Sequence, residues 1–441
     1  MTKPKLLAST LFLLGACATD SDPMMPAVAT PTAFTLRIEN IAPWTVLKSG
    51  AAGTHALAPG DSYDITFTAG TKQSVSFAAM MGESNDWFFA PGPKGIALYD
   101  ADGNPVSGDV TSQVSLWNAG TEIDQEPAVG DATGPMQPAP DFGAADPDPT
   151  VRQIGQMAML SDGTSFELPP IDQMIRVTLT PGANRMFTLH VENVSTATTL
   201  VTSAGARAIH ISPAVWALHI APAPLFTPGE ADRAQGLELI AESGRGAMLA
   251  GELRSLTGWA TPISPGVFAV HRDAEPLYAL GLADRGEGLE VLAESGNNTV
   301  LSSGMRTAVS SIGAFDLPVG AAAKAAAKPG DAYEIQISGN PGEAVSFASM
   351  FGMSDDWFFA TNPDGIALFD ADGTPRSGDV TEEVGIYDAG TELDEEPAIG
   401  ADTGPQQAAP DQGPADPIHL VREADYAVPA SAHLRVTLTP Q

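Results

Sequence analysis

The chain has 441 residues, of which 54 are acidic and 21 are basic, so its formal net charge is −33 at pH 7. An excess of negative charge on this scale repels nucleic acid and anionic membrane surfaces, and it favours solubility and divalent cations. With 43% hydrophobic residues the chain is not disordered as a whole, and a single cysteine, Cys17, excludes a disulfide framework or thiolate metal site.

The N-terminus has the pattern of an export signal. Two lysines precede an apolar run at residues 6–14, which is too short to span a bilayer, and Leu-Gly-Ala then stands directly before Cys17. Small residues before a lone cysteine resemble the bacterial lipobox, which implies a lipoprotein signal peptide at residues 1–16 and lipidation of Cys17. An ordinary signal peptide with a chance cysteine is the alternative. Residues 17–33, small, acidic and proline-rich, are predicted to be a lipid-anchored flexible tether.

Two long segments of the remaining sequence are copies of each other, since residues 82–147 recur without a gap as residues 352–417. Each copy closes with a similar strand-like heptapeptide, IRVTLTP or LRVTLTP, and each is preceded by a similar opening strand, FTLRIEN or FTLHVEN. Self-similarity of this kind indicates duplicated structural units. We therefore predict two tandem domains, at residues 34–182 and 185–441.

A shorter duplication lies within the second predicted domain, where residues 212–244 resemble residues 264–296. Both units end in GLE(L/V)(I/L)AESG, which has apolar residues at helical spacing and a glycine stop, so each unit is predicted to be a strand, a loop and a short helix. Elsewhere SYDITFTAG, SVSFAAM and AYEIQIS alternate apolar and polar residues between Pro-Gly and Asp-Gly turns. The sequence therefore predicts an all-β fold of tandem antiparallel β-sandwiches, with short helices inserted in the second domain.

Each long copy carries an aspartate before an aromatic run and, further along, a loop with spaced acids, YDAGTELDEE in the second copy. Calcium takes roughly six to eight hard oxygen ligands, which loops of carboxylates and backbone carbonyls supply. The runs Trp87-Phe88-Phe89 and Trp357-Phe358-Phe359 are predicted to lie in the core, and the aspartate before each could instead cap a turn. The acids at residues 394–396 are predicted to be a solvated loop rather than ligands.

At these residues the chain resembles the spondin N-terminal domain family. Both copies carry the signature of that family, as SNDWFFAPGPKGIAL with LWNAGTE and as SDDWFFATNPDGIAL with IYDAGTE, and the resemblance covers most of the chain after the tether. It implies antiparallel β-sandwiches related to the calcium-dependent phospholipid-binding sandwiches, each with one calcium ion held at three acidic positions. The matching positions are Asp86, Asn118 and Glu122 in the first domain and Asp356, Asp388 and Glu392 in the second. Asn118 departs from the acid that the family usually has, which weakens the case for calcium in the first domain.

Sequence motifs of catalysis are missing. The seven histidines are scattered, and the chain has no His-Glu-x-x-His motif, Gly-x-Ser-x-Gly elbow, phosphate-binding loop or dinucleotide-binding glycine pattern. His190, His210, His219 and His271 lie in strand-like apolar surroundings and are predicted to be structural. Paired carboxylates could serve as the acid and base of a glycosidase, but nothing else indicates a sugar cleft. We therefore expect the protein not to be an enzyme.

Together these features predict a non-catalytic, calcium-binding lipoprotein of the bacterial cell envelope, anchored to the membrane through Cys17 and active in adhesion or matrix interaction. The expected partner is an extracellular protein or glycan and not a nucleic acid. Ala18 is not the aspartate that retains many lipoproteins in an inner membrane, so the outer membrane is the predicted location. Two alternatives stay open, namely a passive envelope protein that uses calcium only for folding, and metal-dependent binding of lipid or glycan. The sequence leaves the oligomeric state open.

Overall fold

The computed structural model of the chain describes residues 30–134, 136–272, 275–304 and 309–441. The predicted signal peptide, Cys17 and most of the predicted tether lie outside these residues. The described part is mostly β-structure in antiparallel sheets with a few short helices, which confirms the predicted all-β class. Among the described helices, none is both long enough and apolar enough to cross a bilayer.

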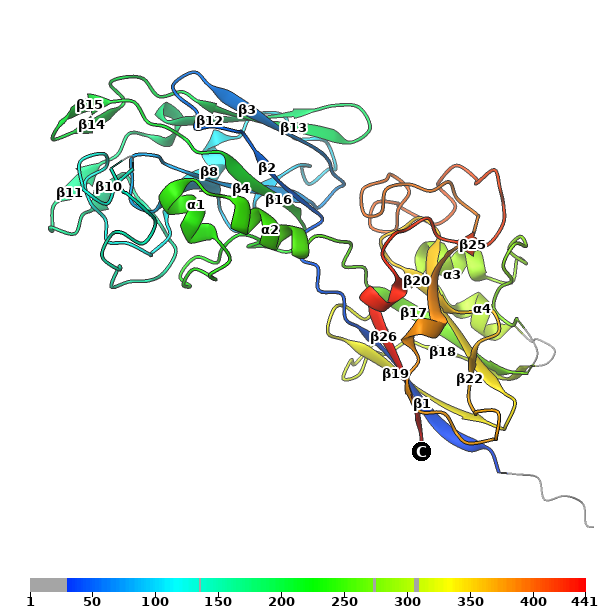
Figure 1. Cartoon of the computed structure of the whole chain (residues 1–441). Coiled ribbons are helices and arrows are strands. Elements are labelled where there is room, and N and C mark those ends of the chain that lie inside the picture. Colours follow the sequence, from blue (N-terminus) through cyan, green and yellow to red (C-terminus); the bar gives the residue numbers. More distant parts are fainter. Residues whose placement is uncertain (1–29, 135, 273–274, 305–308) are drawn as a thin grey trace, which may run out of the picture.

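The chain forms two lobes that lie next to each other (Figure 1). Lobe I comprises residues 45–258, and lobe II comprises residues 30–42 together with residues 259–441. Within the described residues, each lobe is a sandwich of one four-stranded and one seven-stranded sheet, and two short helices cover the outer face of the larger sheet.

The smaller sheet of lobe I contains, in spatial order, β3 (Ser62–Thr68), β13 (Met186–Asn193), β12 (Ile175–Pro181) and β7 (Gly108–Asp109). Its larger sheet contains β2 (Lys48–Ala52), β16 (Ala214–His219), β4 (Ser74–Met80), β5 (Trp87–Pro91), β8 (Val114–Asn118) and β9 (Arg152–Gln153), with β6 (Ile96–Ala97) paired to β4. Two small hairpins are formed by β10 (Met157–Met159) with β11 (Ser165–Glu167) and by β14 (Leu200–Thr202) with β15 (Gly205–Arg207). The helices are α1 (Leu237–Ser243) and α2 (Ala247–Ser255), with the 3-10 turns η1 (Thr111–Gln113) and η2 (Ile171–Gln173).

The smaller sheet of lobe II contains, in spatial order, β19 (Ala332–Gly339), β1 (Thr32–Asn40), β26 (Leu434–Pro440) and β23 (Gly378–Asp379). Its larger sheet contains β18 (Val309–Phe315), β17 (Ile263–His271), β20 (Ala344–Phe351), β21 (Trp357–Thr361), β24 (Val384–Asp388) and β25 (Arg422–Glu423), with β22 (Ile366–Ala367) paired to β20. The helices are α3 (Leu289–Ser295) and α4 (Thr299–Ser303), with the 3-10 turns η3 (Thr381–Glu383) and η4 (Ala430–Ala432).

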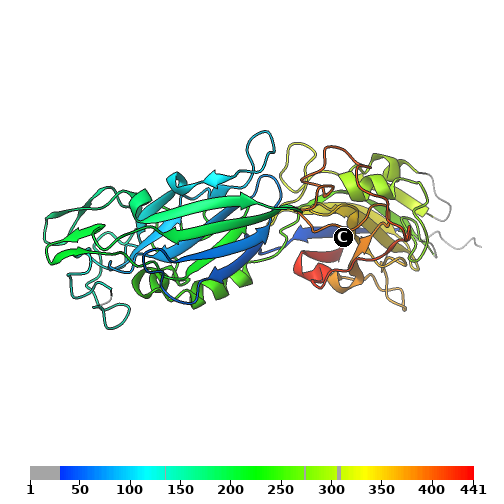
Figure 2. The same ribbon diagram turned by 90° about the horizontal axis from the view of Figure 1, so that it is seen from above.

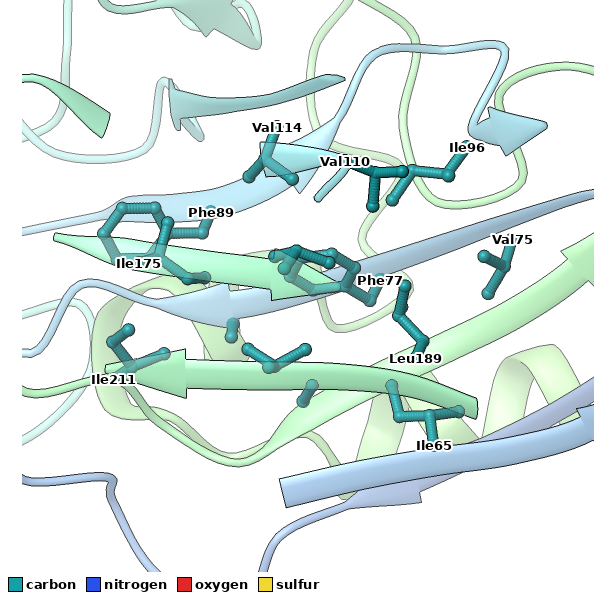
Figure 3. Packing of buried hydrophobic residues seen from close by; sticks show 14 of the residues in the cluster. Ile65, Val75, Phe77, Phe89, Ile96, Val110, Val114, Ile175, Leu189 and Ile211 are labelled. Carbon is teal, nitrogen blue, oxygen red and sulfur yellow. The ribbon is translucent and has the colours of Figure 1, made fainter. Parts of the chain in front are cut away.

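The larger sheet of each lobe is buried on both faces, and the aromatic run shows how. Trp87 and Phe89 point into the core between the two sheets of lobe I, where Figure 3 shows Phe89 with Phe77 and Ile175. Phe88, between them in sequence, points to the opposite face and packs under α1 and α2, because successive side chains of a strand alternate. Trp357-Phe358-Phe359 divides in the same way in lobe II. The predicted burial of both aromatic runs is confirmed.

The two similar opening strands do not belong to the copies that they precede, so the predicted boundaries at 34–182 and 185–441 need correction. β1 lies between β19 and β26 in lobe II, with Leu36 opposite Ile335 and Leu438. β13 lies between β3 and β12 in lobe I, with Leu189 opposite Ile65 and Leu179. Figure 1 shows β1, at the blue end of the chain, beside the C-terminal strand β26. Both strands alternate apolar and polar residues in the same way, so their sequences alone do not determine which sheet they enter.

Each strand of the two sheets has a counterpart in the other lobe, but the chain order differs. Lobe II begins with β1 and continues from β17 to β26, whereas lobe I begins with β2 and ends with β13, β16 and the helices. Lobe I is thus a circular permutation of lobe II, inserted between β1 and β17. Equivalent asparagines support this correspondence, since Asn40 donates to the carbonyl oxygens of Thr261 and Ala327 and Asn193 donates to the matching carbonyls of lobe I.

The two strand–loop–helix units are also divided between the lobes. The predicted strands and helices are present, because β16 leads to α1 and β17 leads to α3, and each helix ends at a glycine with positive φ. The first unit, however, belongs to lobe I, where β16 pairs with β2 and β4. The helices α1 to α4 do lie within residues 185–441, as predicted, but α1 and α2 pack on the larger sheet of lobe I.

The lobes contact each other through a segment of lobe II that follows its acidic loop. Glu396 forms an ion pair with Lys48 (2.6 Å), and the carbonyl oxygen of Ala398 accepts a hydrogen bond from the side-chain amide of Gln73 (2.7 Å). Ala398 and Ile399 are buried against the core of lobe I. Figure 2 shows this junction from above. The acidic loop of lobe II is therefore held between its own sandwich and lobe I.

Candidate cation sites

One end of each sandwich is formed by the turn before β21 and the loop after β24 in lobe II, and by their counterparts in lobe I. β21 and β24 pair with Trp357 opposite Asp388, so Asp356 and Asp388 come to the same end of the sheet. The register of β5 and β8 places Trp87 opposite Asn118 in the same way. The strand pairing thus brings the first two predicted ligand positions of each lobe together.

Asp356 organises the loop after β24. Its Oδ2 atom accepts hydrogen bonds from the backbone N–H groups of Thr391 (2.7 Å) and Glu392 (3.1 Å) and from the hydroxyl of Thr391 (2.9 Å). Asp86 accepts the same three kinds of bond in lobe I. The Oδ1 atoms of both aspartates have no hydrogen-bond partner among the described residues, although both side chains are fully buried. A buried carboxylate oxygen without a partner is costly, as expected of an atom that awaits a ligand.

In lobe II, Asp356 belongs to a cluster of four aspartates. Asp355, Asp356 and Asp394 each place one carboxylate oxygen within 4.8 Å of the other two. Asp388 is fully buried beside them. Within the described part of the chain, the one cation in contact with these four residues is Arg422, which pairs with Asp388 and lies 3.4 Å from Asp394.

The electrostatics of this cluster favour an additional positive charge. Burial, together with the charge of Asp356, raises the pKa of Asp355 to about 8. The pKa of Asp388 is also raised, because burial and the neighbouring Asp356 and Asp394 outweigh the attraction of Arg422. Four carboxylates, three of them fully buried, thus share one guanidinium. Such a group could hold a metal ion.

Lobe I replaces two of these four aspartates by amides. Asn85 stands at the position of Asp355 and Asn118 at that of Asp388. The side-chain amide of Asn118 donates to Asp124 (2.8 Å), and that of Asn85 donates to Glu122 (3.4 Å). These amide N–H groups satisfy Asp124 and Glu122 in lobe I, but they leave the Oδ1 atom of Asp86 without a partner. Asp86 nevertheless stays strained electrostatically, because burial raises its pKa to about 7.

The residues predicted as ligands in lobe II separate into two environments. Asp356 and Asp388 belong to the aspartate cluster, whereas the carboxylate of Glu392 accepts a bond from the backbone of Gly413 (2.7 Å) and borders a different cavity. Asp394 is exposed, as the predicted solvated loop requires, and it also accepts the indole N–H of Trp357 (2.6 Å) and lies close to Asp355 and Asp356. In the sequence, only the position of Asp394, two residues after Glu392, indicated that it could lie near the predicted ligands.

Two of the histidines predicted to be structural form the same buried pair in both lobes. The Nε2 atom of His219 lies 2.9 Å from the hydroxyl of Ser76, and that of His271 lies 2.8 Å from the hydroxyl of Ser346. All four side chains are buried, and each pair joins two neighbouring strands of the larger sheet. These contacts agree with the structural role that was predicted for the two histidines.

The aspartate cluster should make lobe II less stable at high pH when no cation is bound. An ordinary aspartate has a pKa near ~3.9 in the unfolded chain, whereas Asp355 has a pKa of about 8 in the folded protein. Between these values the folded state holds protons that the unfolded state has lost, so stability falls as the pH rises through this window. In a chelator we expect a lower melting temperature at pH 8.5 than at pH 6. The difference should be about 2–4 °C for each kcal/mol by which the free energy of unfolding falls.

Thermal unfolding at both pH values, with chelator and with calcium, measures this effect. The variant Asp355→Asn should show a weaker pH dependence in chelator. A cation that binds the cluster should reduce the difference in the unaltered chain, because the ion replaces protons. A melting temperature in chelator that rises from pH 6 to pH 8.5 would contradict the prediction that the buried carboxylates destabilise lobe II at high pH.

The ligand atoms that lobe II offers are carboxylate oxygens, held by the pairing of β21 with β24 and by the loop that Asp356 organises. Oxygen ligands of this kind suit hard divalent cations. Comparison of the chain with known protein families found no matching family, and comparison with curated proteins found no match. The likeness to spondin N-terminal domains therefore rests on the sequence motifs.

Proposed function

We propose that the protein is a non-catalytic, calcium-binding lipoprotein of the cell envelope whose lobe II holds a calcium ion at Asp355, Asp356, Asp388 and Asp394. The observation that carries this proposal is the buried Oδ1 atom of Asp356, which has no hydrogen-bond partner among the described residues and lies amid like charges. The spondin-like motifs at the same residues support calcium as the ion. The lipobox at Cys17 supports attachment to a membrane.

Calcium suits this cluster better than the other common ions. Its ligands are hard oxygens in an irregular loop, which matches the flexible coordination of calcium, whereas magnesium keeps several waters and zinc prefers nitrogen or sulfur. Binding would offset the repulsion among the four aspartates and fix the loop that continues to Glu396 at the junction with lobe I. An ordered loop at one end of the sandwich is a suitable surface for adhesion to an extracellular protein or glycan.

Calorimetric titration of calcium into residues 30–441 tests the proposal. Asp356→Asn should remove binding at this site, because the amide keeps the acceptor for the loop N–H groups but loses the charge. Asp86→Asn is the matched control in lobe I and should leave the titration unchanged, since Asn85 and Asn118 leave that cluster with two carboxylates instead of four. No saturable binding in millimolar calcium, or equal effects of the two variants, would refute the assignment.

A second candidate function, calcium-dependent binding to lipid headgroups, is favoured by exposed apolar side chains at the same end of lobe II. These are Leu282, Leu393, Ile418 and Leu420, each at least 38% exposed. At the positions of Leu282, Ile418 and Leu420, lobe I carries Glu230, Asp148 and Thr150. Since the net charge of −33 opposes contact with an anionic surface, such binding should require calcium. Sedimentation with phosphatidylserine vesicles, with calcium and with chelator, distinguishes this function from binding to a protein or glycan.

A further inference from the structure

A second group of carboxylates lies beside the first helix of lobe II. Glu290 and Glu294 stand one turn apart on α3, and Asp411 reaches them from the loop between β24 and β25. One carboxylate oxygen of each lies within 4.8 Å of the others. No lysine or arginine of the described chain forms an ion pair with any of the three. Burial and the nearby charges of Glu392 and Glu290 raise the pKa of Glu294 to about 7.

A buried oxygen of Glu392 points to a ligand at this group. Glu392 is 3% exposed, and its Oε2 atom has no hydrogen-bond partner in the described structure. Together with Glu290 and Asp411, Glu392 borders a cavity of about 380 Å³ that also reaches Thr391 and His419. A fourth carboxylate, buried and with an unpartnered oxygen, thus borders the same cavity as Glu290 and Asp411.

Lobe I has the same three acids but no free fourth carboxylate. Asp141, Glu238 and Glu242 occupy the equivalent positions, and their oxygens also lie within 4.8 Å of one another. Glu122, the counterpart of Glu392, is satisfied there, because both of its oxygens accept hydrogen bonds from neighbouring side-chain amides and from the backbone of residue 143.

The difference between the lobes has a definite origin in two side chains. Asn85 donates to Glu122 in lobe I, but Asp355 stands at that position in lobe II and has no N–H group to donate. Gln137 also donates to Glu122, whereas its counterpart Gln407 donates to the backbone carbonyl of residue 294. Glu392 in lobe II therefore lacks both of the side-chain donors that satisfy Glu122 in lobe I.

We propose that Glu290, Glu294, Asp411 and Glu392 hold a second divalent cation in lobe II, with part of its coordination shell open to the cavity. The four carboxylates supply the hard oxygen ligands that calcium takes. This group shares no residue with the aspartate cluster, so the two ions are separate sites. Glu392, which the family resemblance places with Asp356, is thereby assigned to the second cation. Ligand positions that face the cavity are filled by water or by an oxygen of a bound partner.

The stoichiometry of calcium binding to residues 30–441, measured by equilibrium dialysis, tests this inference. The unaltered chain should bind two calcium ions, and Glu290→Gln with Glu294→Gln should reduce this to one. The matched pair in lobe I, Glu238→Gln with Glu242→Gln, should leave two. Asp411→Asn provides a single change at an exposed position that should also weaken one site while leaving the thermal unfolding transition in chelator intact.

The outcomes separate this inference from the proposed function. If the unaltered chain binds one ion that Asp356→Asn removes, the second site is refuted and the first stands. If Glu290→Gln with Glu294→Gln removes one ion while Asp356→Asn removes none, the second site stands and the aspartate site is refuted. Two ions retained in the folded Glu290→Gln, Glu294→Gln and Asp411→Asn variants would overturn the inference.

Discussion

A fragment of residues 45–258 should fold by itself, whereas a fragment of residues 34–182, which the sequence repeats mark as a domain, should not. The first contains all strands of both sheets of lobe I with α1 and α2. The second lacks β13, β16 and both helices. β1 could take the place of β13, because the two strands alternate alike, but nothing in the fragment replaces β16 between β2 and β4.

The expected loss in the shorter fragment exceeds the stability of an ordinary domain. Without β16 and the helices, Phe88 and Trp117 lose the residues that cover them, and so does the rest of that face of the larger sheet. Each large apolar side chain that returns to water costs about 1.5–3 kcal/mol, against a total of about 5–15 kcal/mol for a domain. Far-ultraviolet circular dichroism during heating should show a cooperative transition for residues 45–258 and none for residues 34–182.

Lobe II supplies the reciprocal control. A fragment of residues 259–441 lacks β1, the strand between β19 and β26, and should unfold without cooperativity. Adding a peptide of residues 30–42 should restore the transition, because it returns Phe34, Leu36 and Ile38 to the core. Cooperative melting of monomeric residues 34–182, or of residues 259–441 without the peptide, would contradict the nested arrangement of the lobes.

Local patterns in the sequence predicted the local features of this fold. Alternation and turns indicated the β class, the aromatic runs indicated the core, and the helical spacing before Gly244 and Gly296 indicated two short helices. The assignment of strands to lobes was not predictable in this way, because it depends on pairing between residues far apart in the chain. Phe34 and Phe187 begin nearly identical strands, and only the complete sheets determine where each one pairs.

The candidate site divides between predictable and unpredictable parts for the same reason. Asp356 and Asp388 stand next to recognisable motifs, and the register of β21 with β24 brings them together. Glu290 and Glu294 lie on a helix that is far from Asp411 in sequence, so the three acids come together only when α3 packs on the larger sheet. Arg422 likewise enters the cluster through β25 and carries no motif of its own.

Changing Asn85 and Asn118 together to aspartate should turn lobe I into a calcium-dependent lobe. The two changes recreate the aspartate cluster of lobe II, and they remove the amide N–H groups that now satisfy Glu122 and Asp124. In chelator the new buried charges lack a partner, which costs about 3–5 kcal/mol. Calcium at about 100 times its dissociation constant returns about 2.7 kcal/mol, so the melting temperature should rise by roughly 5–10 °C on adding calcium.

Differential scanning calorimetry of residues 30–441 with chelator and with calcium measures this gain, and dialysis should count one more bound ion than in the unaltered chain. The reverse exchange, Asp355→Asn with Asp388→Asn, is the matched control and should remove calcium binding at the aspartate cluster while making lobe II less sensitive to chelator. If the two aspartates in lobe I bring neither an additional ion nor stabilisation by calcium, the exchange of amides for acids is not what distinguishes the lobes.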